Sequence, residues 1–195
     1  EARLTDEQNG MLPWVFESDL PAVYEVAHAL GLATPNINLL TDVIACPGGD
    51  FCSLANARTL HIADHVLQRY QDVNEVLDIG PIDLHMSGCI NSCGHHHSGH
   101  IGILGVDKDG KEWYQVTLGG ADGTTLSGPA IGGKVVGPAF CAAEIPDVLE
   151  ALLRTYRALR QPGELFIDAL RRIGHDPFKA AANAARHPRA EAAAI

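Results

Sequence analysis

The chain has 195 residues, enough for one domain with a sizeable core or for one domain and part of another. With 46% hydrophobic and 19% charged residues, its composition is that of a globular protein. The formal net charge of −10 argues against nucleic acid as a partner, because phosphate binding needs a basic face. No apolar run reaches membrane-spanning length and no signal peptide is visible, so we expect no membrane segment and a cytoplasmic location.

The first segment predicts a turn, a strand and a short helix. The turn and the strand are expected between Arg3 and Val15. The helix follows and ends at Gly31, with Pro21 in its first turn and apolar residues along one face. The chain opens at Glu1 without a methionine and begins in the middle of a pattern, so we expect it to be a fragment of a longer protein.

The next segment predicts a strand, a loop and a helix. Residues 36–45 favour a strand or an extended approach to the loop "CPGGDF", where proline and two glycines exclude regular structure. From Cys52 to Tyr70 the pattern is helical. The residues expected on its core face are Leu54, Ile62, Val66 and Leu67.

The second half predicts a hairpin followed by helices. Residues 82–86 alternate as in a strand, and strands at 100–106 and 112–118 are joined by an Asp-Gly turn. A glycine-rich connection with at most one strand follows. Helices are expected at 145–159, with an apolar stripe, and at 164–173, before an alanine-rich tail that we expect to fray.

Four of the five cysteines fall into two close pairs. Cys46 and Cys52 have five residues between them, Cys89 and Cys93 have three, and 36 residues separate the pairs. An odd number of cysteines in a chain of this size is a poor disulfide framework. The pairs therefore indicate a metal centre, and Cys141 stands apart as a fifth thiol.

The spacing favours an iron–sulfur cluster over zinc. Structural zinc sites pair ligands two to four residues apart, which the gap of five fits poorly. Four thiolates suit a [4Fe-4S] cluster, whose negative charge calls for backbone N–H donors and a helix N-terminus nearby. We expect Cys52 at the start of a helix, and the glycines of "CPGGDF" and "SCGH" to let backbone amides approach the cluster.

The motifs "CPGGDFCSLA", "SGCINSCG" and "YQVTLGG" resemble the C-terminal half of siroheme-dependent sulfite and nitrite reductases. The resemblance covers nearly the whole chain, and its details are more similar to bacterial assimilatory sulfite reductase haemoprotein subunits than to nitrite reductases. It implies an α+β fold, a mixed sheet with flanking helices. The implied divisions are the end of a ferredoxin-like subdomain at 1–35, a [4Fe-4S]/siroheme domain at 36–178 and the tail at 179–195.

The resemblance implies a set of roles for the cysteines. Cys46, Cys52, Cys89 and Cys93 would hold a [4Fe-4S] cluster, and Cys93 would also ligate the siroheme iron. The implied reaction is the six-electron reduction of sulfite to sulfide, with electrons from a flavoprotein or ferredoxin. Because the family's residues for siroheme and its small anion substrate lie largely in the N-terminal half, that half is an expected partner and this chain alone is expected to be inactive.

Residues near the cysteines are further candidates by resemblance. Asn91 and Ser87 would lie against the cluster, with turn capping as the alternative. The polar residues expected at the siroheme edge, or in an ordinary polar turn, are Thr5, Gln8 and Asn9.

The run "HHHSGH" departs from the family pattern, which usually has an acidic residue where this chain has His100. No spacing gives four zinc ligands from these residues without taking a cysteine from the cluster. We expect these histidines to be exposed or to act on the cluster indirectly, by tuning it or relaying protons. They are His95, His96, His97 and His100.

Two other functions stay open. A siroheme nitrite reductase, converting nitrite to ammonia, shares the same motifs. A non-catalytic structural module, holding zinc or a cluster through four cysteines, would share only the metal-binding residues.

Overall fold

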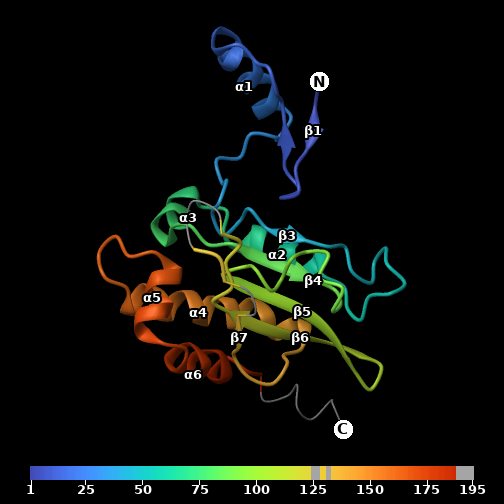
Figure 1. The fold of residues 1–195 in the computed structure, drawn as a ribbon, viewed down its shortest axis with the longest axis vertical. Helices are drawn as coiled ribbons and strands as arrows, with labels where there is room; N and C mark the ends of the chain where they lie inside the picture. Colours follow the sequence, from blue (N-terminus) through green and yellow to red (C-terminus); the bar gives the residue numbers. More distant parts are fainter. Residues whose placement is uncertain (124–127, 131–132, 188–195) are drawn as a thin grey trace. The chain divides into compact units, whose positions relative to one another are not determined.

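The computed structural model describes residues 1–123, 128–130 and 133–187. The chain forms two compact units, Glu1–Ile37 and Asn38–Ile195. Figure 1 shows the helices and strands of each unit.

The first unit is a small hairpin followed by a helix. Strands β1 (Arg3–Leu4) and β2 (Gly10–Met11) are antiparallel, where the sequence predicts one strand after a turn. A 3-10 turn at Glu17–Asp19 leads into α1 (Leu20–Ala29), which confirms the predicted helix. No residue of 1–37 is buried, although all of them are described. The unit therefore has no core of its own.

The second unit is built on a five-stranded mixed sheet, ordered β3-β4-β5-β6-β7. β3, β4 and β5 run parallel to one another, and β6 is antiparallel to both of its neighbours, β5 and β7. This confirms the predicted mixed sheet. The strands are β3 (Ile44–Ala45), β4 (Leu84–Ser87), β5 (Ile101–Lys108), β6 (Lys111–Leu118) and β7 (Lys134–Val135).

The hairpin between β5 and β6 is the predicted one, with a tighter turn. The strands reach Lys108 and Lys111, so only Asp109 and Gly110 make the turn. Both have positive φ, 55° and 75°, which is the conformation that an Asp-Gly turn between twisted strands requires. In the glycine-rich connection that follows, β7 is the one named strand of the described part, and residues 124–127 and 131–132 lie outside it.

Helices complete the second unit. α4 packs against α2, α5 and α6 (Figure 1). The predicted stripe of α4 is buried from Val148 to Tyr156 and joins the single large core cluster, while Leu159 stays 43% exposed. The helices are α2 (Leu60–Arg69), α3 (Val73–Ile79), α4 (Ile145–Leu159, after a 3-10 turn at Ala142–Glu144), α5 (Phe166–Ile173) and α6 (Asp176–Ala184). None of the described helices is long and apolar enough to cross a membrane.

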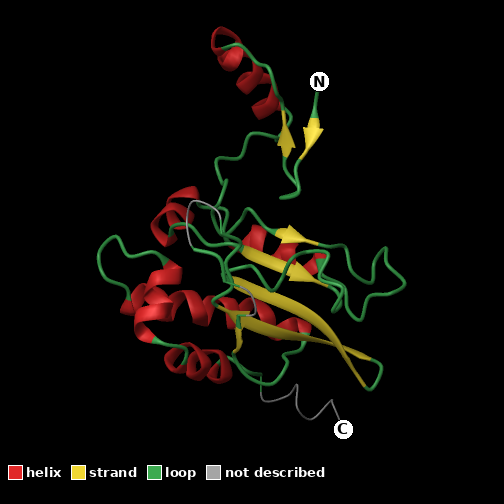
Figure 2. Ribbon diagram, viewed as in Figure 1, coloured by secondary structure: helices red, strands yellow, loops and turns green. Residues whose placement is uncertain are grey.

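Two predicted elements are shorter than expected. Of residues 36–45, only 44–45 form a strand, because the Asp42 carboxylate accepts the Asn38 N–H at 2.9 Å and holds a turn there. The helix predicted from Cys52 begins only at Leu60, and residues 46–59 form a long loop (Figure 2). Accordingly, the predicted core residue Leu54 is 71% exposed.

The C-terminal prediction is also corrected in part. The alanine-rich tail is helical up to Ala184, and Ala182 is fully buried, so this part packs rather than frays. Arg186 then donates to the carbonyl of Ala139 at 3.3 Å. Residues 188–195 lie outside the described part.

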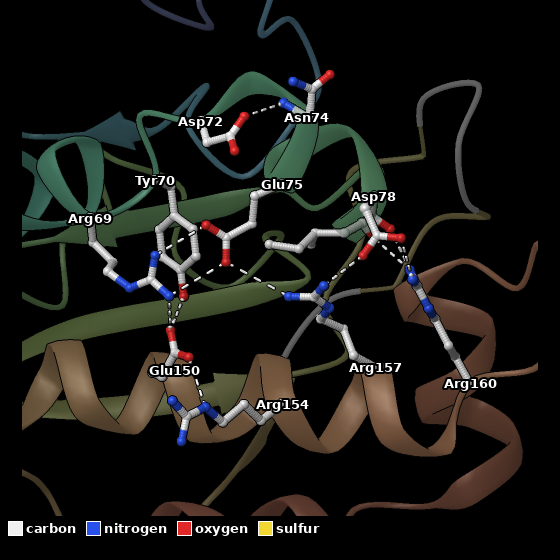
Figure 3. Close-up of polar contacts among 11 residues, drawn as sticks. Arg69, Tyr70, Asp72, Asn74, Glu75, Asp78, Glu150, Arg154, Arg157 and Arg160 are labelled. Atoms are coloured by element: carbon white, nitrogen blue, oxygen red, sulfur yellow. Dashed lines mark hydrogen bonds and ion pairs between the residues drawn. The ribbon is translucent and has the colours of Figure 1, made fainter.

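An ion-pair cluster joins α3 to α4 on the surface (Figure 3). Asp78 of α3 accepts from Arg157 and from Arg160, each at 2.9 Å. The Asp78 side chain is 49% exposed, so solvent weakens both pairs.

We expect Asp78→Asn to lower the free energy of unfolding by about 1 kcal/mol, an effect that shrinks at high salt. Urea denaturation at low and high ionic strength measures it. Asp64→Asn is the matched control, since Asp64 is an exposed acid of α2 outside the cluster. Equal losses in the two variants, or a loss that salt leaves unchanged, would contradict the ion-pair origin.

Candidate metal centre

The two cysteine loops leave the sheet at the same edge. β3 and β4 are parallel, with Ala45 opposite Met86. Cys46 follows β3 directly, and its N–H donates to the Met86 carbonyl at 3.1 Å. Cys89 follows the end of β4 after one residue. Since the carboxyl ends of neighbouring parallel strands meet at one edge, the two loops start side by side, where ligands of such sheets commonly bind.

Gly88 ties the two loops together. Its N–H donates to Cys46 Sγ at 3.1 Å. Its carbonyl accepts the N–H groups of Asn56 and Ala57, at 2.8 and 3.1 Å. Hydrogen bonds to cysteine sulfurs are among the features that tune an iron–sulfur cluster. The contacts thus connect cysteine pairs that lie 36 residues apart in the sequence.

Glycines make this contact possible. A Cβ on Gly88 would lie 2.6 Å from the Ala57 carbonyl oxygen and from Gly48 Cα. A Cβ on Gly94 would lie 1.8 Å from the Met86 carbonyl oxygen. The sequence predicts that Gly94 brings a backbone amide close to a cluster, and the structure shows that Gly94 and Gly88 allow close contacts between the two loops and β4.

The site is open on the side of two cysteines. Cys89 is buried at 7% exposure and Cys46 is half-buried, whereas Cys52 and Cys93 are exposed. All four are free thiols. Large apolar side chains beside them are also exposed, namely Phe51 (82%), Leu54 (71%) and Ile90 (82%). Because α2 starts at Leu60, no helix begins at Cys52, and the predicted helix dipole there is wrong.

The donor chemistry fits a cluster better than a single ion. Among the described residues, no three Cys, His, Asp or Glu side chains converge on a point where one metal ion would sit. Zinc would need its ligands about 2.0–2.3 Å from one centre. In a [4Fe-4S] cluster each cysteine binds a different iron, so the thiolates stand farther apart. Four free thiols on two joined loops therefore suit the cluster.

The histidines of "HHHSGH" have different surroundings. His95 is exposed, and its carbonyl oxygen lies 3.1 Å from Nδ1 of the buried His85 on β4. His96 and His97 are half-buried and hydrogen-bond to Ser92. Burial lowers the pKa values of His85 and His96. His95, His96 and His97 belong to the segment that runs from Cys93 to β5, and His85 lies beside it on β4.

His100 is buried at 1% exposure, so of the two predicted alternatives the exposed one does not hold for it, and an indirect role stays a prediction. Its Nδ1 accepts the Asp83 N–H at 3.1 Å, and its Nε2 lies 3.3 Å from Asp83 Oδ2. Burial lowers the pKa of His100 and raises that of Asp83. The two residues meet because β4 and β5 pair in the register Leu84–Ile101, which the sequence alone does not reveal.

The other predicted residues divide between the units. Ser87 is fully buried and its hydroxyl accepts the Gly94 N–H at 3.1 Å, and its place against a cluster stays a prediction. Asn91 is exposed on the Cys93 loop. In the first unit, the Thr5 N–H donates to the Asn9 carbonyl at 2.9 Å across the β1–β2 turn, which includes Gln8. A role of Thr5, Gln8 and Asn9 at the siroheme stays a prediction.

Comparisons with known proteins agree with this metal centre. A family model described as the nitrite and sulphite reductase 4Fe-4S domain matches residues 38–188. Sulfite reductase [ferredoxin] 2 of Mycolicibacterium paratuberculosis is 31% identical over 91% of this chain and 33% of its own length. Ferredoxin–nitrite reductase of Synechococcus elongatus is 31% identical over 78% of this chain and 30% of its own length.

A solved structure is similar as well. The NirA protein of Mycobacterium tuberculosis superposes with a TM-score of 0.69 and 26% identity, over 91% of this chain and 33% of that one. The chain thus spans about a third of the length of the relatives it matches. With the fold, the two joined cysteine loops and the family model in agreement, the chain belongs to the nitrite and sulphite reductase 4Fe-4S domain family.

Proposed function

We propose that Cys46, Cys52, Cys89 and Cys93 ligate a [4Fe-4S] cluster and that Cys93 also binds the iron of a siroheme. The observation that supports this most is the Gly88 junction, because it brings the loops of both cysteine pairs together at one sheet edge. Cys89 would anchor the buried side of the cluster and the exposed Cys93 the open side. There its sulfur is accessible to a second group.

The proposed reaction is the six-electron reduction of sulfite to sulfide, with this chain as the cluster-bearing C-terminal part of the enzyme. The bound cluster and siroheme would supply the electron transfer and the binding of the anion. The chain's own residues would hold the thiolates in place: Gly88 donates to Cys46 Sγ, and Ser87 fixes Gly94 next to Cys93. The upstream half would complete the site and cover the exposed apolar side chains beside the cysteines.

Ferredoxin or a flavoprotein is the proposed electron donor, and ferredoxin is named in the Mycolicibacterium sulfite reductase and the Synechococcus nitrite reductase. Nitrite reduction to ammonia is the second candidate, because the Synechococcus nitrite reductase is as similar, at 31% identity, as the mycobacterial sulfite reductase. Turnover of sulfite and of nitrite by the chain joined to its upstream half, with reduced ferredoxin, separates the two.

Anaerobic iron, zinc and acid-labile sulfide analysis with a visible spectrum tests the metal centre. We expect about four irons and about four sulfides per chain and a brown protein. One zinc per chain without sulfide would refute the cluster and support the structural module.

A further inference from the structure

The backbone on both sides of Cys93 is in a costly conformation. Ser92 has φ 60° and His95 has φ 52°, both in the left-handed region that side chains other than glycine avoid. Such conformations persist only where the surroundings hold them in place. Serine lacks the freedom of glycine at this φ, so we expect its side chain to make contacts that stabilise the conformation.

Those contacts come from the Ser92 hydroxyl. Its Oγ lies 2.6 Å from Nδ1 of His97 and 3.1 Å from Nδ1 of His96. A hydroxyl has one hydrogen, so it donates to one ring and accepts an N–H from the other. The two rings meet edge to face, with centroids 5.6 Å apart. Ser92 and both histidines thus form one hydrogen-bonded group whose members lie on both sides of Cys93 in the sequence.

The same segment is fixed to β4 at two further points. The Gly94 N–H donates to Ser87 Oγ, and the His95 carbonyl lies 3.1 Å from His85 Nδ1. These two bonds hold Gly94 and His95, which follow Cys93. The bonds to His96 and His97 hold Ser92, which precedes Cys93. The Cys93 side chain itself is exposed, so its direction depends on the backbone that carries it.

We propose that Ser92, His96 and His97 form a clamp that positions Cys93 for ligation. The inference rests on the proposed ligand role of Cys93. It assigns a structural task to two histidines that the cluster does not use as ligands. Ser92, His96 and His97 are positioning residues, acting on the cluster through Cys93.

The test compares Ser92→Ala with Ser92→Asn in the full chain. Alanine removes the hydrogen bonds and keeps the unfavourable φ, whereas asparagine tolerates that φ and restores a donor and an acceptor. Ser18→Ala is the matched control, because Ser18 is exposed in the first unit and its hydroxyl bonds the Asp19 carboxylate. The readouts are amide hydrogen exchange of residues 93–97 without metal, and the reduction potential of the bound cluster after anaerobic reconstitution.

We expect exchange of these amides to be about tenfold faster in Ser92→Ala, as the loss of one to two hydrogen bonds implies, with a shifted cluster potential. Ser92→Asn should restore both readouts and Ser18→Ala should change neither. If Ser92→Ala does not fold, His97→Gln takes its place with the same expected result. The clamp would be overturned if the amides of Ser92→Ala exchanged at the wild-type rate. It would also be overturned if they exchanged faster while the cluster potential stayed unshifted. If the wild-type chain takes up no cluster, the proposed function is refuted. The exchange rates of residues 93–97, measured without metal, would still test whether the clamp holds this segment.

Discussion

Replacing Cys93 by serine is expected to reduce the cluster content of the reconstituted chain to background. A serine hydroxyl does not supply the thiolate that iron–sulfur clusters require. The fold should survive, because the Cys93 side chain is exposed and surface substitutions usually change the free energy of unfolding by less than about 0.5 kcal/mol. Iron and sulfide analysis measures the first effect, and urea denaturation of the metal-free chain measures the second.

The control for Cys93→Ser is Cys141→Ser. Cys141 lies at the turn before α4, away from the two cysteine loops, so its variant should keep the full cluster content. In the proposed enzyme, where an upstream half would complete this chain, Cys93→Ser should also remove the spectroscopic coupling between cluster and siroheme. A coupled spectrum in that variant would contradict the bridging role of the Cys93 sulfur.

Gly94→Ala is expected to disturb both cysteine loops at once. The new Cβ would lie 1.8 Å from the Met86 carbonyl oxygen and 3.0 Å from the Cys46 nitrogen, both backbone atoms that cannot turn aside. We expect the free energy of unfolding to fall by about 3 kcal/mol or more, and the cluster content to fall with it. Urea denaturation followed by circular dichroism, together with iron analysis, measures both effects.

Gly10→Ala is the matched control for Gly94→Ala. A Cβ on Gly10 would meet no atom within 4 Å. Its effect on stability should stay below about 1 kcal/mol. If Gly94→Ala were as mild as Gly10→Ala, the close contact between the loops would not exist in solution.

Sequence patterns predicted the elements whose stability is local. The stripe of α4 and the Asp-Gly hairpin need only helix periodicity and turn chemistry, and both are present. The start of α2 was misplaced, because the Gly88 carbonyl takes the N–H groups of Asn56 and Ala57 and keeps that stretch out of a helix. A pattern within one segment carries no record of a hydrogen bond to a partner more than 30 residues away.

The sequence likewise predicts part of the candidate site, the cysteine pairs, and not the contacts of the histidines. The two cysteine pairs are visible as spacing, and their loops do meet at one sheet edge. The partners of the histidines were not visible. His100 pairs with Asp83 because of strand register, and the bonds of Ser92 to His96 and His97 accompany a left-handed backbone at Ser92. Both depend on three-dimensional arrangement rather than on residue type.

The pairing of β3 with β4 covers only two residue pairs. A group bound to both cysteine loops would therefore act as a chemical cross-link across the 36 residues between Cys52 and Cys89. By the loop-closure relation used for disulfides, such a cross-link contributes about 4 kcal/mol against unfolding. Chains with the bound group would then be unfolded less often than chains without it. The rate of proteolysis depends on the population of the unfolded form, so it would be lower for chains with the bound group. A protease could thereby remove chains that never received their cluster and spare those that did.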